Sequence, residues 1–334
     1  MFIFTEGAVM VRAHSGRSHV ATAAKSAAVA ATAATALLLT SGCATTAPGQ
    51  VAADVSGAGS GRTITVVAAE NFWGSIAAQL GGSHVTETSI ITNPDTDPHD
   101  YEATPADART ISAAQVFIQN GLGYDSSWAP KLVAANPNAN RTVLTVGDIV
   151  GLKDGDNPHQ WYAKSSVYQV IDAITAAYQK ADPADAGYFA AQKSRFELTT
   201  LAPYNQLISD IRDRYAGTPI GASESIVSGL ADTLGLKMLT PATFLRDISE
   251  GNDPTAADKT LIDRQIKSKA IKVYVYNSQN ATPDIAAQVA EAKAEGIPVT
   301  TVTETLFPSG DTFQQWQLTQ LEELESALAR ATGR

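Results

Sequence analysis

Two loops of the 334-residue chain carry a histidine in the same local frame. His99 lies in "DPHDY" and His159 lies in "NPHQW", so each follows an acidic or amide residue and a proline. A single histidine in such a loop is more often a surface or capping residue than a ligand. A frame that recurs in two loops indicates a shared task, and neutral imidazole is a common ligand of transition metals. The remaining histidines are assigned to surface or capping roles: His14, His19 and His84.

Two glutamates occupy comparable positions after expected strands. Glu224 follows "PIGAS" and Glu304 follows "IPVTTVT". A single glutamate at a strand end is often a neighbour of a helix N-cap or a salt-bridge partner. In open α/β sheets, however, ligand sites gather beyond the carboxyl ends of the strands. Two imidazoles and two carboxylates would neutralise a divalent cation, and each carboxylate can bind through one or both oxygens. The four side chains could therefore face one cleft.

The segments around these residues alternate between strand and helix patterns. Strands are expected first at "TITVVAA" (63–69), "VTETSIIT" and "VFIQNG", and later at "TPIGAS", "LKMLT", "IKVYVYN" and "IPVTTVT". Helical patterns such as "NFWGSIAAQLGG" and "PDIAAQVAEAKAEG" separate them. This alternation predicts an α/β fold with two Rossmann-like lobes and largely parallel sheets.

The middle of the chain breaks this alternation. Its apolar residues recur every three to four positions, which predicts one long rigid helix over residues 186–216, kinked at Pro203. This helix would join an N-terminal α/β lobe over 62–185 to a C-terminal α/β lobe over 217–334. Because two candidate ligands lie on either side of it, the metal site is expected in the cleft between the lobes.

The N-terminal segment has the composition of an export signal followed by a linker. A basic region, an apolar run too short for a membrane span and "SGC" end at Cys43, the single cysteine of the chain. This pattern predicts a lipoprotein signal peptide over 1–42, with lipidation of Cys43. Thr40 stands where a bacterial lipobox usually has leucine, so an ordinary signal peptide with a free cysteine is the alternative. The small, glycine-rich stretch over 43–61 predicts a flexible tether.

Composition excludes several classes of protein. Hydrophobic residues make up 44% of the chain and charged residues 17%, which is typical of a globular protein. The formal net charge is −10 and the sequence has no basic stripe, so no nucleic-acid partner is expected. The sequence also has no HExxH helix, GxSxG elbow or P-loop, the motifs of common hydrolases and nucleotide-binding enzymes.

Seven longer motifs strengthen the prediction of a metal site: "DPHDYEATPADA", "QNGLGYD", "NPHQWY", "GASES", "ISEGNDP", "YNSQNATP" and "TETLFPSGDTFQQWQ". From Thr63 to its C-terminus the chain resembles the solute-binding lipoproteins of zinc and manganese ABC transporters, the cluster A-I binding proteins. In that family four side chains, two from each lobe, hold one metal ion, and a rigid helix spans the lobes. The resemblance implies a set of four ligands: His99, His159, Glu224 and Glu304.

The resemblance also implies a function. The chain would be a monomeric receptor on the extracytoplasmic face of the membrane, anchored by lipid, that captures Mn²⁺ or Zn²⁺ and delivers it to an ABC permease. Fe²⁺ is a further candidate cargo, and no enzymatic activity is expected. One alternative is a metal-dependent hydrolase, which needs an open coordination position for water and a general base. The other is a metal-binding adhesin lipoprotein, which would leave the two histidine frames without a purpose.

Two departures from the family pattern concern the choice of metal. Glu224 stands where many zinc-specific members have histidine, and their histidine-rich loop between the first two ligands is absent. Harder oxygen ligands favour Mn²⁺ relative to a site with three histidines. By the Irving–Williams order the same site should still bind Zn²⁺ more tightly than Mn²⁺ in solution. Asn277 stands where many members have an acidic residue, so Asn277 and Gln279 are expected in supporting or structural roles. Asn277 and Glu70 remain the alternatives to Glu304 as the fourth ligand.

Metal-bound imidazoles need partners that fix their orientation. Three acidic residues close in sequence to the two histidines are the candidates, with solvation of the surface as the alternative for at least one of them: Asp97, Asp100 and Asp156.

Overall fold

The computed structural model describes residues 61–280 and 282–334, and all of these belong to one unit of the chain. The expected signal peptide over 1–42, Cys43 and the tether up to residue 60 lie outside the described residues. Within the described part of the chain, no helix combines the length and the apolar character that a membrane crossing requires.

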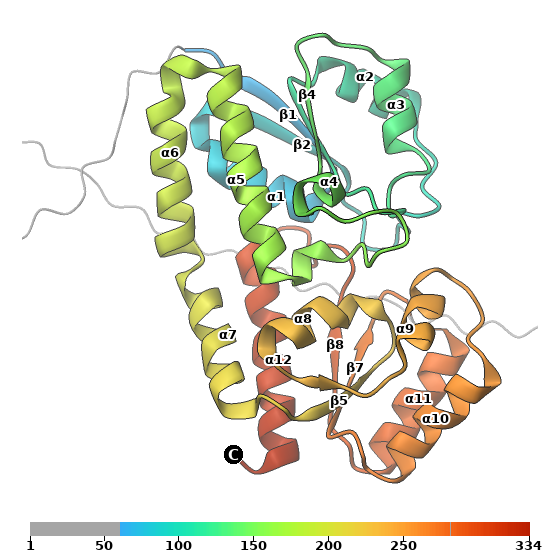
Figure 1. The fold of residues 1–334 in the computed structure, drawn as a ribbon. Helices are drawn as coiled ribbons and strands as arrows, with labels where there is room; N and C mark the ends of the chain where they lie inside the picture. The colour runs from blue at the N-terminus through green and yellow to red at the C-terminus, as the bar shows by residue number, and fades with distance from the viewer. Residues whose placement is uncertain (1–60, 281) are drawn as a thin grey trace, which may run out of the picture. The chain divides into compact units, whose positions relative to one another are not determined.

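The first lobe is built on a sheet of four parallel strands in the order β2-β1-β3-β4. Its strands are β1 (Ile64–Glu70), β2 (Val85–Ile91), β3 (Val116–Gln119) and β4 (Thr142–Thr145). Alternate residues of a strand face opposite sides of the sheet. Val66 and Ala68 of β1 accordingly join the core on one face, and Val67 joins the core on the other. Both faces of the sheet are therefore covered by helices (Figure 1).

The helices of the first lobe are α1 (Asn71–Gly81), α2 (Pro105–Ala113), α3 (Ala129–Ala135), α4 (Val146–Val150), α5 (Lys164–Ala181) and α6 (Ala186–Arg195). Short 3₁₀ turns lie at η1 (Gly82–His84), η2 (Gln160–Tyr162) and η3 (Pro183–Asp185). The start of α2 follows from its sequence, because Thr104 accepts a hydrogen bond from the Asp107 backbone and Asp107 accepts one from the Thr104 backbone in return. Pro105 occupies the first turn, where no backbone donor is needed.

The second lobe repeats the strand order of the first. Its four parallel strands run in the order β6-β5-β7-β8. They are β5 (Pro219–Ala222), β6 (Lys237–Met238), β7 (Val273–Asn277) and β8 (Val299–Val302). Its helices are α8 (Ser228–Leu234), α9 (Ala242–Ser249), α10 (Ala256–Lys267), α11 (Pro283–Ala294) and α12 (Phe313–Thr332), with a 3₁₀ turn at η5 (Ser225–Val227). The predicted α/β class with two parallel-sheet lobes is confirmed.

The segment between the lobes is helical, as predicted, but it is not one uniform helix. After α6, a π turn (η4, Phe196–Thr200) precedes Leu201 and then α7 (Ala202–Tyr215). The Leu201 backbone donates to the Phe196 carbonyl at 2.8 Å, five residues back, which is the pattern of a widened turn. Pro203 has no N–H to donate to the preceding turn, so a regular helix cannot run through this point. The long helix is therefore two α-helices joined by a π turn.

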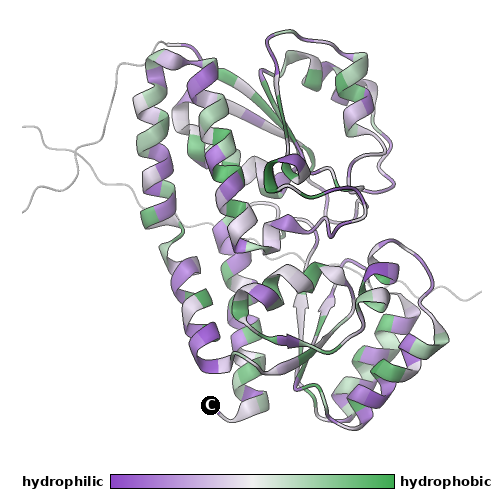
Figure 2. Ribbon diagram, in the orientation of Figure 1, coloured by the Kyte–Doolittle hydropathy of each residue, from purple (hydrophilic) through white to green (hydrophobic). Residues whose placement is uncertain are grey.

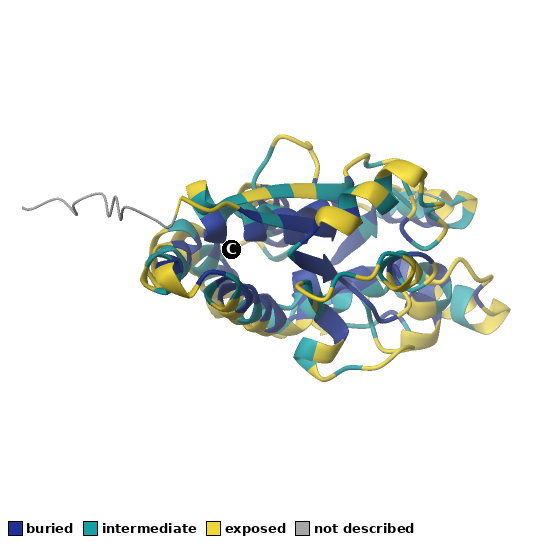
Figure 3. Cartoon of the chain, turned by 90° about the horizontal axis from the view of Figure 1, so that it is seen from above, coloured by how far each residue is buried: buried dark blue, intermediate teal, exposed yellow. Residues whose placement is uncertain are grey.

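One hydrophobic core spans both lobes. It includes Trp73 and Ile174 of the first lobe together with Ile220 and Leu324 of the second. The inner strands β1, β3, β5 and β7 are largely buried, whereas helices carry exposed residues on their outer sides (Figure 3). Helices α5 and α6 carry both hydrophobic and hydrophilic residues (Figure 2). Because the lobes share a core, large hinge motions between them would expose apolar surface.

Helix α12 connects the lobes a second time. Its body packs against α7 and β8 (Figure 1). Its first turn reaches α1 of the first lobe, where the Phe313 backbone donates to Ser75 Oγ at 2.9 Å. Gln314 and Gln79 exchange side-chain hydrogen bonds of 2.8 and 3.1 Å. The C-terminal helix therefore ties the second lobe to the first.

Candidate metal centre

A cleft of about 600 Å³ lies between loops of the two lobes. Residues of the first lobe on its wall include Asp97, His99, Leu122 and Asn157, and residues of the second include Ser225, Leu245, Ser249 and Glu250. Among the four candidate ligands, His99 lines this cleft, while His159 and Glu224 are 2% and 1% exposed and so lie deeper.

His99 is held by its backbone. Its N–H donates to Asp97 Oδ1 at 2.9 Å, and its carbonyl accepts a hydrogen bond of 3.0 Å from Ser127 Oγ. The imidazole ring stands edge-to-face against Tyr124, with ring centroids 5.1 Å apart. Its Nε2 atom is buried and has no hydrogen-bond partner. Nε2 of His99 is therefore free of protein hydrogen bonds and could bind a metal ion.

His159 repeats this turn, which explains the shared sequence frame. Its N–H donates to Asn157 Oδ1 at 3.0 Å, and its ring Nδ1 lies 2.8 Å from the same oxygen. A proton on Nδ1, donated to this oxygen, orients the ring. Nε2 lies 3.3 Å from Oε1 of Glu304, across the boundary between the lobes. In both loops the first residue of the frame thus caps the backbone of the histidine.

The acidic residues expected to fix the imidazoles do not contact the rings in this way. Asp97 accepts from the backbone of His99, and Asp156 accepts from the backbone of Lys153 at 2.9 Å. The partner of the His159 ring is the amide of Asn157. At His159 the residue two positions before the histidine orients the ring, whereas at His99 the residue in that position contacts the backbone.

Glu304 is positioned by two amide side chains. Asn277 Nδ2 donates to Oε2 of Glu304 at 3.0 Å, and Gln279 Oε1 accepts from the backbones of Glu304 and Thr305 at 2.7 and 2.9 Å. Burial alone would raise the pKa of Glu304. The hydrogen bond and charge of His159, together with Asn277, instead hold this pKa below its ordinary value. Glu304 is therefore an ionised ligand candidate.

Glu224 lies just beyond the end of β5 and has one satisfied oxygen. Asn280 Nδ2 donates to Oε2 at 2.8 Å, while Oε1 is buried without a partner. Burial, followed by the charge of Glu304, raises the pKa of Glu224 to about 8. A buried carboxyl group that shares its surroundings with a carboxylate lacks a compensating positive charge.

The four residues are gathered unequally. His159 and Glu304 are in contact, and the charge of Glu304 helps to raise the pKa of Glu224. The charge of His99 helps to lower the pKa of Glu304, and the Tyr124 ring lies 6.1 Å from that of His159. Among residues 61–280 and 282–334, no three His, Cys, Asp or Glu side chains have the spacing of a metal site.

Sequence reasoning did not identify three of the supporting residues: Asn157, Asn280 and Tyr124. Asn157 could have been found from its place in the "NPH" frame, since asparagine folds back on its own loop. Asn280 follows a strand end in "YNSQN", but nothing local marks it as the partner of Glu224. Tyr124 has no sequence signal for its position beside both imidazoles.

Two other residues lie outside this group. His84 pairs with Asp185 at 2.9 Å and stacks on Tyr188 at 3.8 Å, so its structural assignment agrees with its contacts. Glu70 is fully buried at the end of β1, and the group that acts on it most strongly is Asp125.

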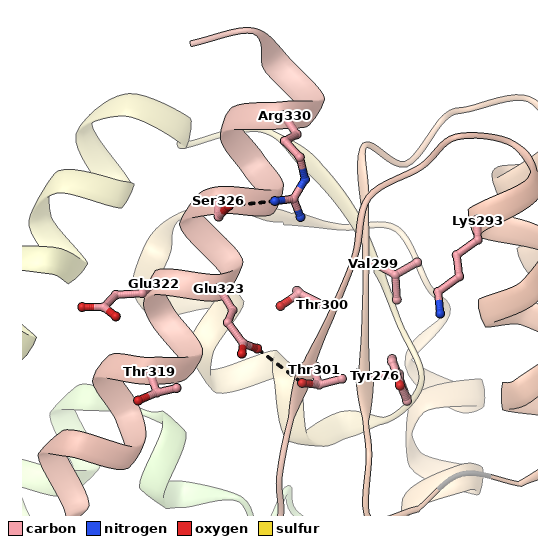
Figure 4. A pocket seen from close by; sticks show the side chains of 10 residues that line it. All are labelled: Tyr276, Lys293, Val299, Thr300, Thr301, Thr319, Glu322, Glu323, Ser326 and Arg330. Carbon is pink, nitrogen blue, oxygen red and sulfur yellow. Dashed lines mark hydrogen bonds between the residues drawn. The ribbon is translucent and has the colours of Figure 1, made fainter.

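A second groove, of about 620 Å³, lies on the second lobe beside β8 and α12 (Figure 4). Thr301 donates to Glu323 at 3.4 Å within it, and Arg330 donates to Ser326 at 2.7 Å. None of the four candidate ligands lines this groove. The candidate metal site is therefore not in this groove.

Two α/β lobes with parallel sheets of the same strand order and a cleft between them form the architecture of a two-lobed solute-binding protein. Residues 66–327 match the ZnuA family, described as the zinc-uptake complex component A, periplasmic, and the chain belongs to this family.

Similar proteins include manganese-binding lipoproteins. MntA of Halalkalibacterium halodurans is 26% identical over 153 residues, which are 45% of this chain and 50% of that protein, so this match spans half of the relative's length. MntA of Bacillus subtilis is 24% identical over 269 residues, 74% of this chain and 81% of that protein. The manganese ABC transporter substrate-binding lipoprotein PsaA of Streptococcus pneumoniae is 23% identical over 242 residues, 67% of this chain and 75% of that protein.

The fold is also found in solved structures. A Mn-bound periplasmic metal binding protein from Candidatus Liberibacter asiaticus has a TM-score of 0.66 and 22% identity, covering 80% of this chain and 100% of that one. A crystal structure of ZnuA has a TM-score of 0.64 and 20% identity, covering 80% of this chain and 99% of that one.

Proposed function

We propose that His99, His159, Glu224 and Glu304 bind one divalent transition metal ion as cargo. The chain is a solute-binding protein of a metal ABC transporter, and this set of residues is its capture site. The single observation that supports the set best is the contact of His159 Nε2 with Glu304 Oε1 at 3.3 Å, because it brings a ligand of each lobe together.

Two unsatisfied atoms support the remaining pair of ligands. His99 Nε2 and Glu224 Oε1 are both buried without a hydrogen-bond partner. An unpaired polar atom in the protein interior costs free energy, and a metal ion would remove that cost for both atoms. Two carboxylates and two neutral imidazoles would also balance the charge of a dication.

The amides that hold the carboxylates leave room for different ions. Glu224 and Glu304 each keep one oxygen bound to an asparagine, so each can offer one oxygen or rotate to offer two. Coordination could then grow from four towards six, which suits Mn²⁺, while four nitrogen and oxygen ligands suit Zn²⁺. Fe²⁺ fits the same donor set. We expect Glu224→His to raise the selectivity for Zn²⁺ over Mn²⁺.

The cellular setting follows from the N-terminal sequence and from the lipoprotein relatives. Lipidation of Cys43 would hold the protein on the extracytoplasmic face of the membrane, and the tether would let the two lobes reach a permease. The protein acts as a monomer in this proposal, since both ligand pairs come from one chain. Membership of a family of uptake components favours this function over a metal-dependent hydrolase or an adhesin lipoprotein.

Calorimetric titration of the metal-free protein with Mn²⁺ and with Zn²⁺ tests the capture site. Glu304→Gln removes one negative charge and a ligand oxygen, so it should weaken both ions strongly while leaving the fold intact. Glu322→Gln, an exposed change on α12, is the matched control and should bind like the wild type. Equal affinities of Glu304→Gln and the wild type would exclude Glu304 as a ligand and return attention to Asn277.

A further inference from the structure

Two serine side chains of the second lobe lie beside the proposed ligands without being ligands themselves. Ser225 directly follows Glu224 and begins the turn η5, and Ser249 is the last residue of α9. Their hydroxyl oxygens are 2.8 Å apart, and Ser249 Oγ also accepts the backbone N–H of Ser225 at 3.0 Å. Both serines line the cleft between the lobes. Ser249 is thus joined to Ser225 by two hydrogen bonds, although 24 positions of sequence separate them.

Ser225 continues this connection to a ligand candidate of the first lobe. Its Oγ lies 3.3 Å from Nδ1 of His159. Its carbonyl accepts a hydrogen bond of 2.8 Å from Nδ2 of Asn157, whose Oδ1 lies 2.8 Å from the same ring nitrogen. A carbonyl oxygen can only accept, so this bond turns the Asn157 amide with its oxygen towards His159. The side chain and the backbone of Ser225 therefore both act on the orientation of the imidazole.

Helix α9 holds Ser249 in place. One side of the helix buries Phe244, Leu245 and Ile248 in the hydrophobic core. Just beyond its end, Gly251 has a φ of 69°, and its N–H donates to the Ile248 carbonyl at 3.1 Å. Glycine adopts this conformation at the end of a helix without steric cost. The buried side and the glycine stop together fix the last turn of α9, and with it the position of the Ser249 hydroxyl.

We propose that Ser249 is a positioning residue for metal capture, which acts through Ser225 on one candidate ligand from each lobe. Its contact with the Ser225 hydroxyl restrains the imidazole of His159. Its contact with the Ser225 N–H restrains the backbone that carries Glu224. This inference rests on the proposed function, because it concerns two of the four proposed ligands.

A metal site gains affinity when its ligands are held in place before the ion arrives. Nδ1 of His159 faces Asn157 and Ser225, so Nε2 is the nitrogen directed at Glu304. Without the Ser249 hydroxyl, the Ser225 hydroxyl would be free to turn away from the ring, and the Ser225 N–H would lose its acceptor. We therefore expect the ring to sample more orientations, which weakens binding and changes the geometry of the bound ion.

The test compares the wild type with Ser249→Ala, which lacks the hydroxyl, and Ser249→Thr, which keeps it. Affinities for Mn²⁺ and Zn²⁺ are measured by competition with a chelating dye, and circular dichroism checks the metal-free fold. The visible absorption spectrum of the Co²⁺-loaded protein reports the number and geometry of the ligands, which a loss of stability alone would not change. Ser209→Ala, at an exposed serine of α7, is the matched control.

Ser249→Ala should lose about 10-fold in affinity for both ions, the lower end of the range for residues behind metal ligands. Its Co²⁺ spectrum should differ from that of the wild type. Ser249→Thr should restore both the affinity and the spectrum, and Ser209→Ala should match the wild type in both. Wild-type affinity and spectrum in Ser249→Ala, or equal losses in the Ala and Thr variants, would overturn the inference.

A double variant tests whether Ser249 acts through Ser225. Because Ser225→Ala and Ser249→Ala break the same contact, their combination should lose less affinity than the product of the two single losses. Single losses that simply multiply would show independent action and would also overturn the inference. If Ser249→Ala does not fold, Ser225→Ala decides alone, since it should weaken both ions and change the Co²⁺ spectrum, and wild-type behaviour would contradict the proposal.

The failure of the inference and the failure of the proposed function give different results. Absence of metal binding by the wild type would refute the proposed function. Metal binding by the wild type that is lost in Glu304→Gln but unchanged in Ser249→Ala would leave the capture site in place and refute only the role of Ser249.

Discussion

The two lobes have the same strand order but hold their candidate ligands by different means. In the first lobe, His99 and His159 are fixed through backbone hydrogen bonds to a residue two positions earlier in the chain. In the second lobe, Glu224 and Glu304 are held by the amide side chains of residues 56 and 27 positions away. One lobe uses local turns, and the other uses contacts between separate loops.

This difference assigns different mobility to the two kinds of ligand. A proline-containing turn restrains the backbone, so the first lobe presents its imidazoles with little freedom. A carboxylate held by one amide can rotate, so the second lobe can change the number of oxygens that it offers. We infer that the first lobe sets where an ion is held and the second sets which ion is preferred.

Removal of His159 should have the largest effect on metal binding. At a thousandfold excess of metal over its dissociation constant, binding should stabilise the protein by about 4 kcal/mol, and His159→Ala should remove most of that gain because it deletes the ligand in contact with Glu304. The melting temperature with and without metal provides the measurement. His84→Asn, which alters a histidine paired with Asp185, should keep the metal-induced shift. A full shift in His159→Ala would place the site elsewhere.

Loss of the amides of the second lobe should have the next largest effect. Asn277→Ala and Asn280→Ala each free one carboxylate, so affinity for Mn²⁺ and Zn²⁺ should fall by roughly 10- to 100-fold. Titration calorimetry measures this, with the exposed change Asn140→Ala as the control. Unchanged affinities in both site variants would mean that the carboxylates of the second lobe do not depend on their amides.

The pH dependence of Glu224 should sharpen the comparison further. Its pKa is raised to about 8, so a proton must leave before the carboxylate binds metal, and affinity should fall by up to about tenfold per pH unit below that value. For the stability of the metal-free protein, the raised pKa has the opposite pH dependence. The stability that Glu224 contributes is present below its unfolded pKa and is lost as the pH rises through about 8.

Glu224→Gln should therefore melt at a higher temperature than the wild type near pH 8 in the absence of metal, and at the same temperature near pH 4.5. Thermal melts at the two pH values measure this difference. The absence of any gain at the higher pH would show that Glu224 is ionised in the metal-free protein.

The smallest effect is expected where a turn is kept but its charge is removed. Asp97→Asn keeps an oxygen that can accept the N–H of His99, so metal binding should change by less than about 1 kcal/mol. Asp97→Ala removes the acceptor and should weaken binding more. Equal titration curves for the Asn and Ala variants would show that the turn does not position His99.

Much of the fold could be predicted from the sequence, because strand and helix periods are local properties of a chain. The strands at 63–69 and at "VFIQNG" correspond to β1 and β3, and the helical pattern "NFWGSIAAQLGG" corresponds to α1. The apolar spacing of the connecting segment predicts one helix, but a proline affects the hydrogen bonding of the turn before it, and a π turn lies at Phe196–Thr200. A residue pattern does not specify how a helix accommodates such a break.

The sequence by itself determined the turns that present the two histidines, because an asparagine or aspartate two residues before each histidine folds back within its own loop. It also placed Glu224 and Glu304 just beyond strand ends. Only the tertiary structure decided that Asn280 meets Glu224 and that Tyr124 lies beside both imidazoles. These contacts join residues from separate elements, and their distances depend on how the sheets, loops and shared core pack together, which no local pattern encodes.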